Sequence, residues 1–171
     1  MTRQERSWIL YDWANSAYSI IITTAIFPIF FKSVAASGAP GYQSTAWWGY
    51  ANSLYTLLLA VMAPVLGTIA DYQARKKKFF LFFFLLGVLS TLSLYFVGQG
   101  EWVKALLIYM GSALGFSGAN IFYDAFLVDV TTEDRMDWVS TYGYGWGYLG
   151  STIPFVLCLI LITQHKIFGF A

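Results

Sequence analysis

The sequence predicts an all-α fold, a polytopic transmembrane helical bundle, from its composition and from the lengths of its apolar blocks. Of the 171 residues, 58% are hydrophobic and 11% are charged, and the mean hydropathy is +0.60. A soluble domain carries about 25% charged residues. The apolar residues fall into blocks near the roughly 20 residues that a helix needs to cross about 30 Å of hydrocarbon. Barrel strands alternate over about 10 residues, so these continuous blocks favour helices in a lipid bilayer.

Each predicted span is bounded by charge, Gly or Pro. The spans lie near residues 9–31, 47–69, 79–97, 105–127 and 144–162, and together they form one N-terminal transmembrane bundle over residues 1–171.

Lys and Arg in the connections predict the orientation. On the side of the membrane opposite the N-terminus, the connections hold Lys32, Lys104 and Lys166. On the side of the N-terminus they hold Arg3, Arg6, Arg75, Lys76, Lys77, Lys78 and Arg135. Cytoplasmic connections are enriched in Lys and Arg, so we expect the N-terminus inside and, after five spans, the C-terminus outside.

Composition argues against several other classes of protein. The net charge of +1, with one short basic run at residues 75–78, gives no reason to expect a nucleic-acid partner. Cys158 is the single cysteine and His165 the single histidine, so neither has a partner at nucleophile or metal spacing. We expect no enzymatic activity, no metal and no cofactor.

Polar residues within the apolar spans are the candidate substrate contacts, because burying such groups in lipid costs free energy. Asp12, Asn15 and Ser19 share one face of the first span at i, i+3 and i+7, and Asn120 and Asp124 share a face of the fourth at i, i+4. We expect a cavity between these two helices; the alternative is that these groups only hydrogen-bond helices together. The candidate set is Asp12, Asn15, Tyr18, Ser19, Ser117, Asn120 and Asp124.

Small residues recur at helical spacing in the last two spans, where they allow close approach of helix backbones. These small residues either serve helix packing alone or allow the helices to rock against each other during transport. The packing candidates are Gly111 and Gly115, continued by Ala119, and Gly143, Gly147 and Gly150, flanked by Ser140 and Pro154. Before the last span, the hydroxyls and acids at residues 131–134 predict the start of a helix.

The connection at residues 67–76 is too short for a domain and predicts a tight helical hairpin at the inner surface. It resembles the cytoplasmic loop signature of the major facilitator superfamily, in which Gly, an acid four residues later and paired basic residues recur. The matching residues, candidates for a cytoplasmic gating loop, are Gly67, Asp71, Arg75 and Lys76, while Tyr72 and Ala74 depart from the pattern. The alternative is a plain basic loop.

Residues 11–17, with Phe27 and Pro28 downstream, resemble the entry helix of the vacuole-effluxer-like branch of that superfamily, which is related to fungal vacuolar amino-acid effluxers. The segment 122–129 is similar in type. The resemblance implies twelve spans with both termini inside, so we expect the sixth span and the second half to be absent from this chain. The fourth span carries no Arg, which puts proton coupling in doubt.

The expected function is therefore that of a portion of a secondary transporter, which moves a small polar solute, such as an amino acid in efflux, by alternating access. Its expected partners are the bilayer, the solute and the missing half or partner helices. The location would be the plasma membrane in a bacterium or the vacuolar membrane in a fungus. The alternative function is a non-transporting membrane accessory or assembly protein that binds partner helices through its glycine stripes.

Overall fold

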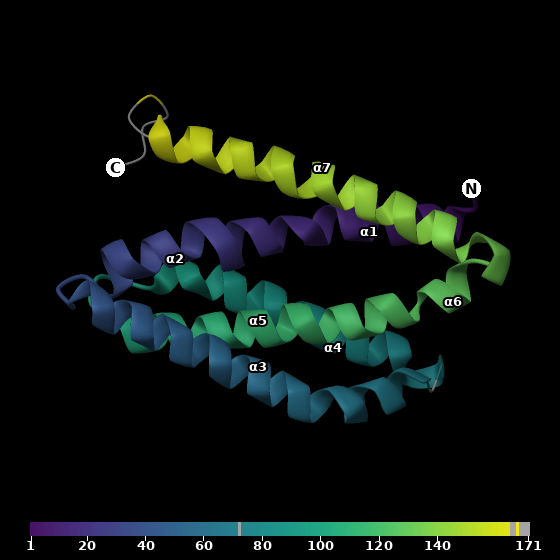
Figure 1. Cartoon of the computed structure of the whole chain (residues 1–171), viewed down its shortest axis with the longest axis horizontal. Helices are drawn as coiled ribbons and strands as arrows, with labels where there is room; N and C mark the ends of the chain where they lie inside the picture. The colour runs from purple at the N-terminus through teal and green to yellow at the C-terminus, as the bar shows by residue number, and fades with distance from the viewer. Residues whose placement is uncertain (72, 165–166, 168–171) are drawn as a thin grey trace. The chain divides into compact units, whose positions relative to one another are not determined.

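The computed structural model describes residues 1–71, 73–164 and 167, except for the side chains at positions 70, 71, 73 and 74. Every regular element among these residues is helical, which confirms the predicted all-α class (Figure 1). Within the described part, five helical stretches are long and apolar enough to cross a membrane: Arg3–Ala35, Gly41–Ile69, Arg75–Phe96, Trp102–Ala125 and Glu133–Thr163. The chain is a multi-pass integral membrane protein.

The first stretch combines α-helical and wider π-helical turns. It consists of α1 (Arg3–Tyr18), a π-helical segment at Ser19–Ala25, α2 (Ile26–Phe30) and a second π-helical segment at Phe31–Ala35. Five consecutive β-branched residues at 20–24 crowd a regular α-helix, and Pro28 removes one backbone donor. These two features explain why the hydrogen-bonding pattern widens here.

The chain divides into two compact units, and the first contains Met1–Phe27 and Leu127–Ala171. It holds α1, the short α6 (Leu127–Val130), a 3-10 turn at Glu133–Arg135 and α7 (Met136–Thr163). Within this unit α1 packs along α7 (Figure 1). The last long helix does begin near residues 131–134, as predicted. The expectation that a threonine hydroxyl there caps the helix is wrong. Thr132 makes no capping hydrogen bond, and the Thr131 hydroxyl donates to Glu5 instead.

The second unit, Pro28–Phe126, contains α3 (Gly41–Asp71), α4 (Gln73–Ser93) and α5 (Trp102–Ala125). The closest packing joins α4 to α5, where Gly87 lies against the backbone of Gly115. Any larger residue at Gly115 would drive its Cβ into the Gly87 backbone. Beside this contact lies a hydrophobic cluster made of Leu66, Phe83, Ala119 and Phe122.

Hydrogen bonds between side chains fix α3 and α4 on α5. The fully buried Tyr109 donates its hydroxyl to Oδ1 of Asn52 at 3.0 Å, and Thr91 pairs with Ser112 at 2.7 Å. Apolar surroundings offer no competing water, so such buried polar groups must find partners within the protein. These two bonds set the registers of α3 and α4 relative to α5.

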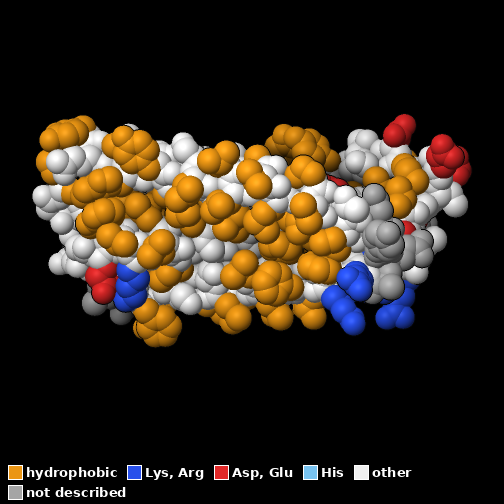
Figure 2. All heavy atoms as spheres, turned by 90° about the horizontal axis from the view of Figure 1, so that it is seen from below, with side chains coloured by type: hydrophobic (Ala, Val, Ile, Leu, Met, Phe, Trp, Pro, Cys, Tyr) orange, Lys and Arg blue, Asp and Glu red, His pale blue; other side chains and the backbone are white. Residues whose placement is uncertain are grey.

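The outer surface of the second unit suits lipid. Large apolar side chains such as Leu57, Val61 and Leu89 are more than half exposed, and hydrophobic side chains are spread across the face in Figure 2. Near the starts of α3 and α5, Trp47 stacks on Trp102 with ring centroids 3.9 Å apart. Tryptophan favours the headgroup level of a bilayer, so this pair marks one membrane interface.

Candidate functional site

The polar stripe predicted in the first span lies on α1 and the turn that follows it. Asp12, Asn15 and Tyr18 are half-buried, whereas Ser19, at the start of the π-helical segment, is exposed. The Tyr11 hydroxyl lies 3.5 Å from Oδ1 of Asn15, to which it donates a long hydrogen bond. Asp12, Asn15 and Tyr18 are therefore polar groups already engaged in contacts.

Within the first unit α7 turns three of its glycines toward α1: Gly143, Gly147 and Gly150. Gly143 lies against the ring of Trp8, and Gly150 lies against the backbone carbonyl of Trp13. A Cβ at Gly147 would sit 2.7 Å from Oγ of Ser16 and 3.3 Å from Oδ2 of Asp12. The missing side chain at Gly147 thus leaves room for two polar groups, including a carboxylate, between two apolar helices.

The predicted contacts of the fourth span lie on α5, in the second unit. Ser117 and Asn120 are half-buried, and Asp124, one residue from the end of α5, is exposed. Asp12 belongs to the first unit, so the expected cavity between the first and fourth spans stays a prediction. On the same helix Gly111 lies beside Ser90 and Gly115 beside Gly87.

The four residues of the predicted gating loop have different surroundings. Gly67 has open space where a Cβ would lie, and Arg75 is exposed. Lys76 is 4% exposed, and its Nζ donates a 2.9 Å hydrogen bond to the Ala125 carbonyl at the end of α5. A cation there pairs with the negative end of the helix. Asp71 ends α3, but its side chain, like residue Tyr72, lies outside the described part.

An ion-pair cluster in the first unit was not among the predicted sites. The Glu5 carboxylate is 1% exposed and receives both Nε and Nη2 of Arg135, at 3.0 and 3.2 Å. It also accepts the Thr131 hydroxyl at 2.9 Å and the Thr2 amide at 2.7 Å. Such a two-pronged Arg–carboxylate pair is directional as well as strong. We name these four residues the Glu5 clasp.

One half of the Glu5 clasp was visible in the sequence. Thr2 and Glu5 form a capping box, the pattern of a hydroxyl followed three residues later by Glu. The other half was not, because Arg135 is 130 positions away and only folding brings it to Glu5. A recess of about 280 Å³ beside the clasp is lined by its four residues together with Asp129, Val130 and Thr132.

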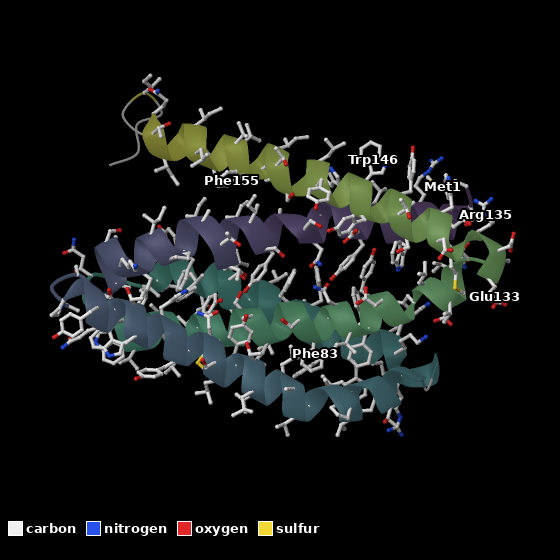
Figure 3. All side chains as sticks on the ribbon, viewed as in Figure 1. Met1, Phe83, Glu133, Arg135, Trp146 and Phe155 are labelled. Atoms are coloured by element: carbon white, nitrogen blue, oxygen red, sulfur yellow. The ribbon has the colours of Figure 1, made fainter. Side chains whose placement is uncertain are left out.

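A second recess lies on α7. It has a volume of about 270 Å³, and one of its lining residues is Gly145, which has nothing within 4 Å of its Cβ position. Trp138 stacks on Tyr142 at 5.0 Å, and Trp146 points away from α1 (Figure 3). This aromatic face of α7 is separate from the glycine face that contacts α1.

The described residues contain no arrangement of side chains typical of a catalytic or metal site. No group of three or more His, Cys, Asp or Glu side chains gathers there to hold a metal ion. Cys158 is half-buried and unbonded to another cysteine, and His165 and Lys166 lie outside the described part. What the geometry does offer is polar groups, among them Asp12 and Ser16, held between two membrane-spanning helices.

The five apolar helical stretches, with polar groups held between some of them, define a multi-pass membrane protein. Residues 41–168 match the family described as vacuole effluxer Atg22 like. The chain belongs to this family.

Two relatives extend the comparison. A Bacillus subtilis (strain 168) protein named as an uncharacterized MFS-type transporter, YxiO, is 59% identical over 162 residues, which cover 94% of this chain and 38% of that protein. An Aquifex aeolicus (strain VF5) protein, named only as an uncharacterized protein, is 23% identical over 165 residues, covering 95% of this chain and 40% of the relative. The chain thus spans about two-fifths of the length of each relative. No solved structure gives a significant match.

Proposed function

We propose that this chain forms part of a secondary transporter of the major facilitator type, which moves a small polar solute, an amino acid, across the membrane by alternating access. The observation that carries the proposal is the 59% identity, over 94% of the chain, to a protein named as an MFS-type transporter. Identity at this level over nearly every span makes a shared helical framework the simplest explanation. The proposed activity belongs to the larger protein that such a framework would complete.

The seam between α1 and α7 supports a polar solute. A carboxylate in an apolar span is costly, and Asp12 lies there beside Ser16 and opposite Gly147. A carboxylate pairs with the ammonium group of an amino acid, while hydroxyl and amide groups bind its carboxylate. In this proposal Asp12 supplies the first contact and Asn15 and Tyr18 supply the second.

Transport by alternating access requires two bundles that move about a shared site. We therefore expect the 171-residue chain alone to give no solute flux in liposomes. A chimera tests the proposal: this chain replaces the matching 162 residues of the Bacillus subtilis relative. Uptake of labelled amino acids into liposomes is measured for the chimera, the relative, the chain alone and empty liposomes.

Two substitutions in the chimera test the role of the seam. Asp12→Asn should reduce uptake at least tenfold, because it removes the charge proposed to bind ammonium. A tenfold loss corresponds to about 1.4 kcal/mol. Ser33→Ala is the matched control, since Ser33 is exposed and bonds only to the backbone of its own helix. Uptake of another solute class would refute the amino-acid assignment alone. A folded chimera and relative that carry no solute would refute transport and favour an accessory protein.

A further inference from the structure

The start of α4 sorts four consecutive basic residues into two groups. Lys76 turns inward, where it is 4% exposed, donates to the Ala125 carbonyl and lies 5.5 Å from the centre of the Phe126 ring. Arg75, Lys77 and Lys78 are exposed. The fold therefore uses one cation for packing and leaves three on the surface.

The exposed cations continue into an exposed apolar stripe on the same helix. Arg75, Lys78, Phe82, Leu85 and Leu89 follow one another at spacings of three and four, which places them on one face. Phe82 and Leu89 are each 60% exposed, and Leu85 is 44% exposed. We call these five residues, with the neighbouring Lys77, the α4 stripe.

Packing leaves this face uncovered because α4 uses its opposite face to bind α5. Phe83 is buried in the cluster with Phe122, and Gly87 contacts the Gly115 backbone. Figure 2 shows a face of the molecule on which Lys and Arg side chains adjoin hydrophobic ones. The face of α4 that contacts α5 is thus apolar and tightly packed, whereas the exposed face carries cations at one end and apolar side chains along the rest.

The dimensions of the α4 stripe match one leaflet of a bilayer. From Lys78 to Leu89 the helix rises about 16 Å, at about 1.5 Å per residue, and half of a roughly 30 Å hydrocarbon core is about 15 Å. The basic end then lies at the headgroup level while the apolar part lies among the acyl chains. Clusters of Lys and Arg at the end of a membrane helix attract anionic lipids.

We propose that the α4 stripe is a binding site for an anionic phospholipid. Its phosphate binds Arg75, Lys77 and Lys78, and one acyl chain lies along Phe82, Leu85 and Leu89. A soluble phosphate complements only the basic end, and a neutral lipid complements only the apolar part. One anionic phospholipid complements both ends of the stripe together.

The test uses the purified chain in detergent, titrated with phosphatidylglycerol or with phosphatidylcholine of the same acyl chains. Bound lipid is counted by native mass spectrometry, and the unfolding temperature is followed in parallel. Each surface cation near an anionic lipid is worth about 1 kcal/mol, or roughly fivefold in affinity. The double variant Lys77→Gln/Lys78→Gln should therefore bind phosphatidylglycerol roughly 30-fold more weakly.

Two control variants distinguish a local site on α4 from a general effect of surface charge. Arg3→Gln/Arg6→Gln removes the same number of exposed charges from α1, a helix of the other unit, and should leave the affinity near that of the parent chain. Lys77→Arg/Lys78→Arg keeps both charges and should keep the affinity. Helicity measured by circular dichroism shows that each variant is folded.

Several results would overturn the proposal. Equal losses in the Lys77/Lys78 and Arg3/Arg6 variants would show an effect of bulk charge. Equal binding of phosphatidylcholine would remove the role of the anion. Stabilisation by inorganic phosphate, at the concentration at which phosphatidylglycerol acts, would assign the basic residues to a soluble anion instead.

Discussion

Replacement of Gly115 by alanine tests the contact that holds α4 against α5. The added Cβ would overlap the backbone nitrogen and Cα of Gly87 and would come 2.8 Å from the Phe83 carbonyl oxygen. Both neighbours are backbone, so a side-chain rotation cannot relieve the overlap and the two helices must separate. Overpacking of this kind costs about 1–3 kcal/mol, and the upper end applies because the backbone must move.

The same substitution also brings a gain. Alanine is favoured over glycine in a helix by about 1 kcal/mol, so the net loss for Gly115→Ala is about 2 kcal/mol, or roughly a 30-fold fall in the folded-to-unfolded ratio. Gly49→Ala is the matched control, since Gly49 lies in α3 of the same unit with nothing within 4 Å of its Cβ position. That variant should equal or exceed the parent in stability.

The assay is reversible unfolding of the purified chain in mixed detergent micelles, followed by circular dichroism. Gly115→Ala should unfold at a lower denaturing-detergent fraction than the parent, and Gly49→Ala should not. Equal stability of the two alanine variants would refute the reasoning, because it would mean that α4 and α5 do not touch through their backbones at this position.

Three further tests address other parts of the fold and the orientation of the chain. Tyr109→Phe leaves Oδ1 of Asn52 without its buried donor and should cost about 1–3 kcal/mol, whereas Tyr50→Phe, at a 73% exposed residue, should change little in the same unfolding assay. Glu5→Gln should free the N-terminal segment, so that limited proteolysis cuts there faster than in Glu101→Gln, whose carboxylate pairs with Lys104 on the surface; equal cleavage rates would contradict the Glu5 clasp. In a Cys158→Ser background, Gln73→Cys should react with an impermeant thiol reagent only from inside and Gln99→Cys only from outside; labelling at Gln73 from outside intact cells would reverse the orientation.

The predicted fold class rested on features that act locally. A block of about 20 apolar residues must satisfy its backbone hydrogen bonds internally, so length and hydropathy alone indicate a transmembrane helix. The capping box of Thr2 and Glu5 is equally local, because both residues lie within one turn, but it was not among the predictions. For these features no information from distant residues was needed.

The partners of individual side chains depended on the tertiary structure. The glycine stripes indicated close packing, but spacing alone cannot say that Gly147 lies against Asp12 and Ser16, or that Gly115 lies against Gly87. Gly118, which lies against the Phe83 ring, was not predicted, although it lies on the same helix as Gly111 and Gly115. A stripe of small residues defines one face of a helix. The residues that pack against that face belong to another helix, which the stripe does not identify.

By itself the sequence determined a helical membrane protein, its apolar spans, its charge asymmetry and its family resemblance, because each follows from the composition of short segments. Only the tertiary structure decided that Lys76 turns inward to the end of α5 while Arg75, Lys77 and Lys78 remain outside. Only folding, likewise, joined Glu5 to Arg135. The physical reason is that a hydrogen bond or an ion pair between residues 49 or 130 positions apart depends on how two helices pack, which no local pattern encodes.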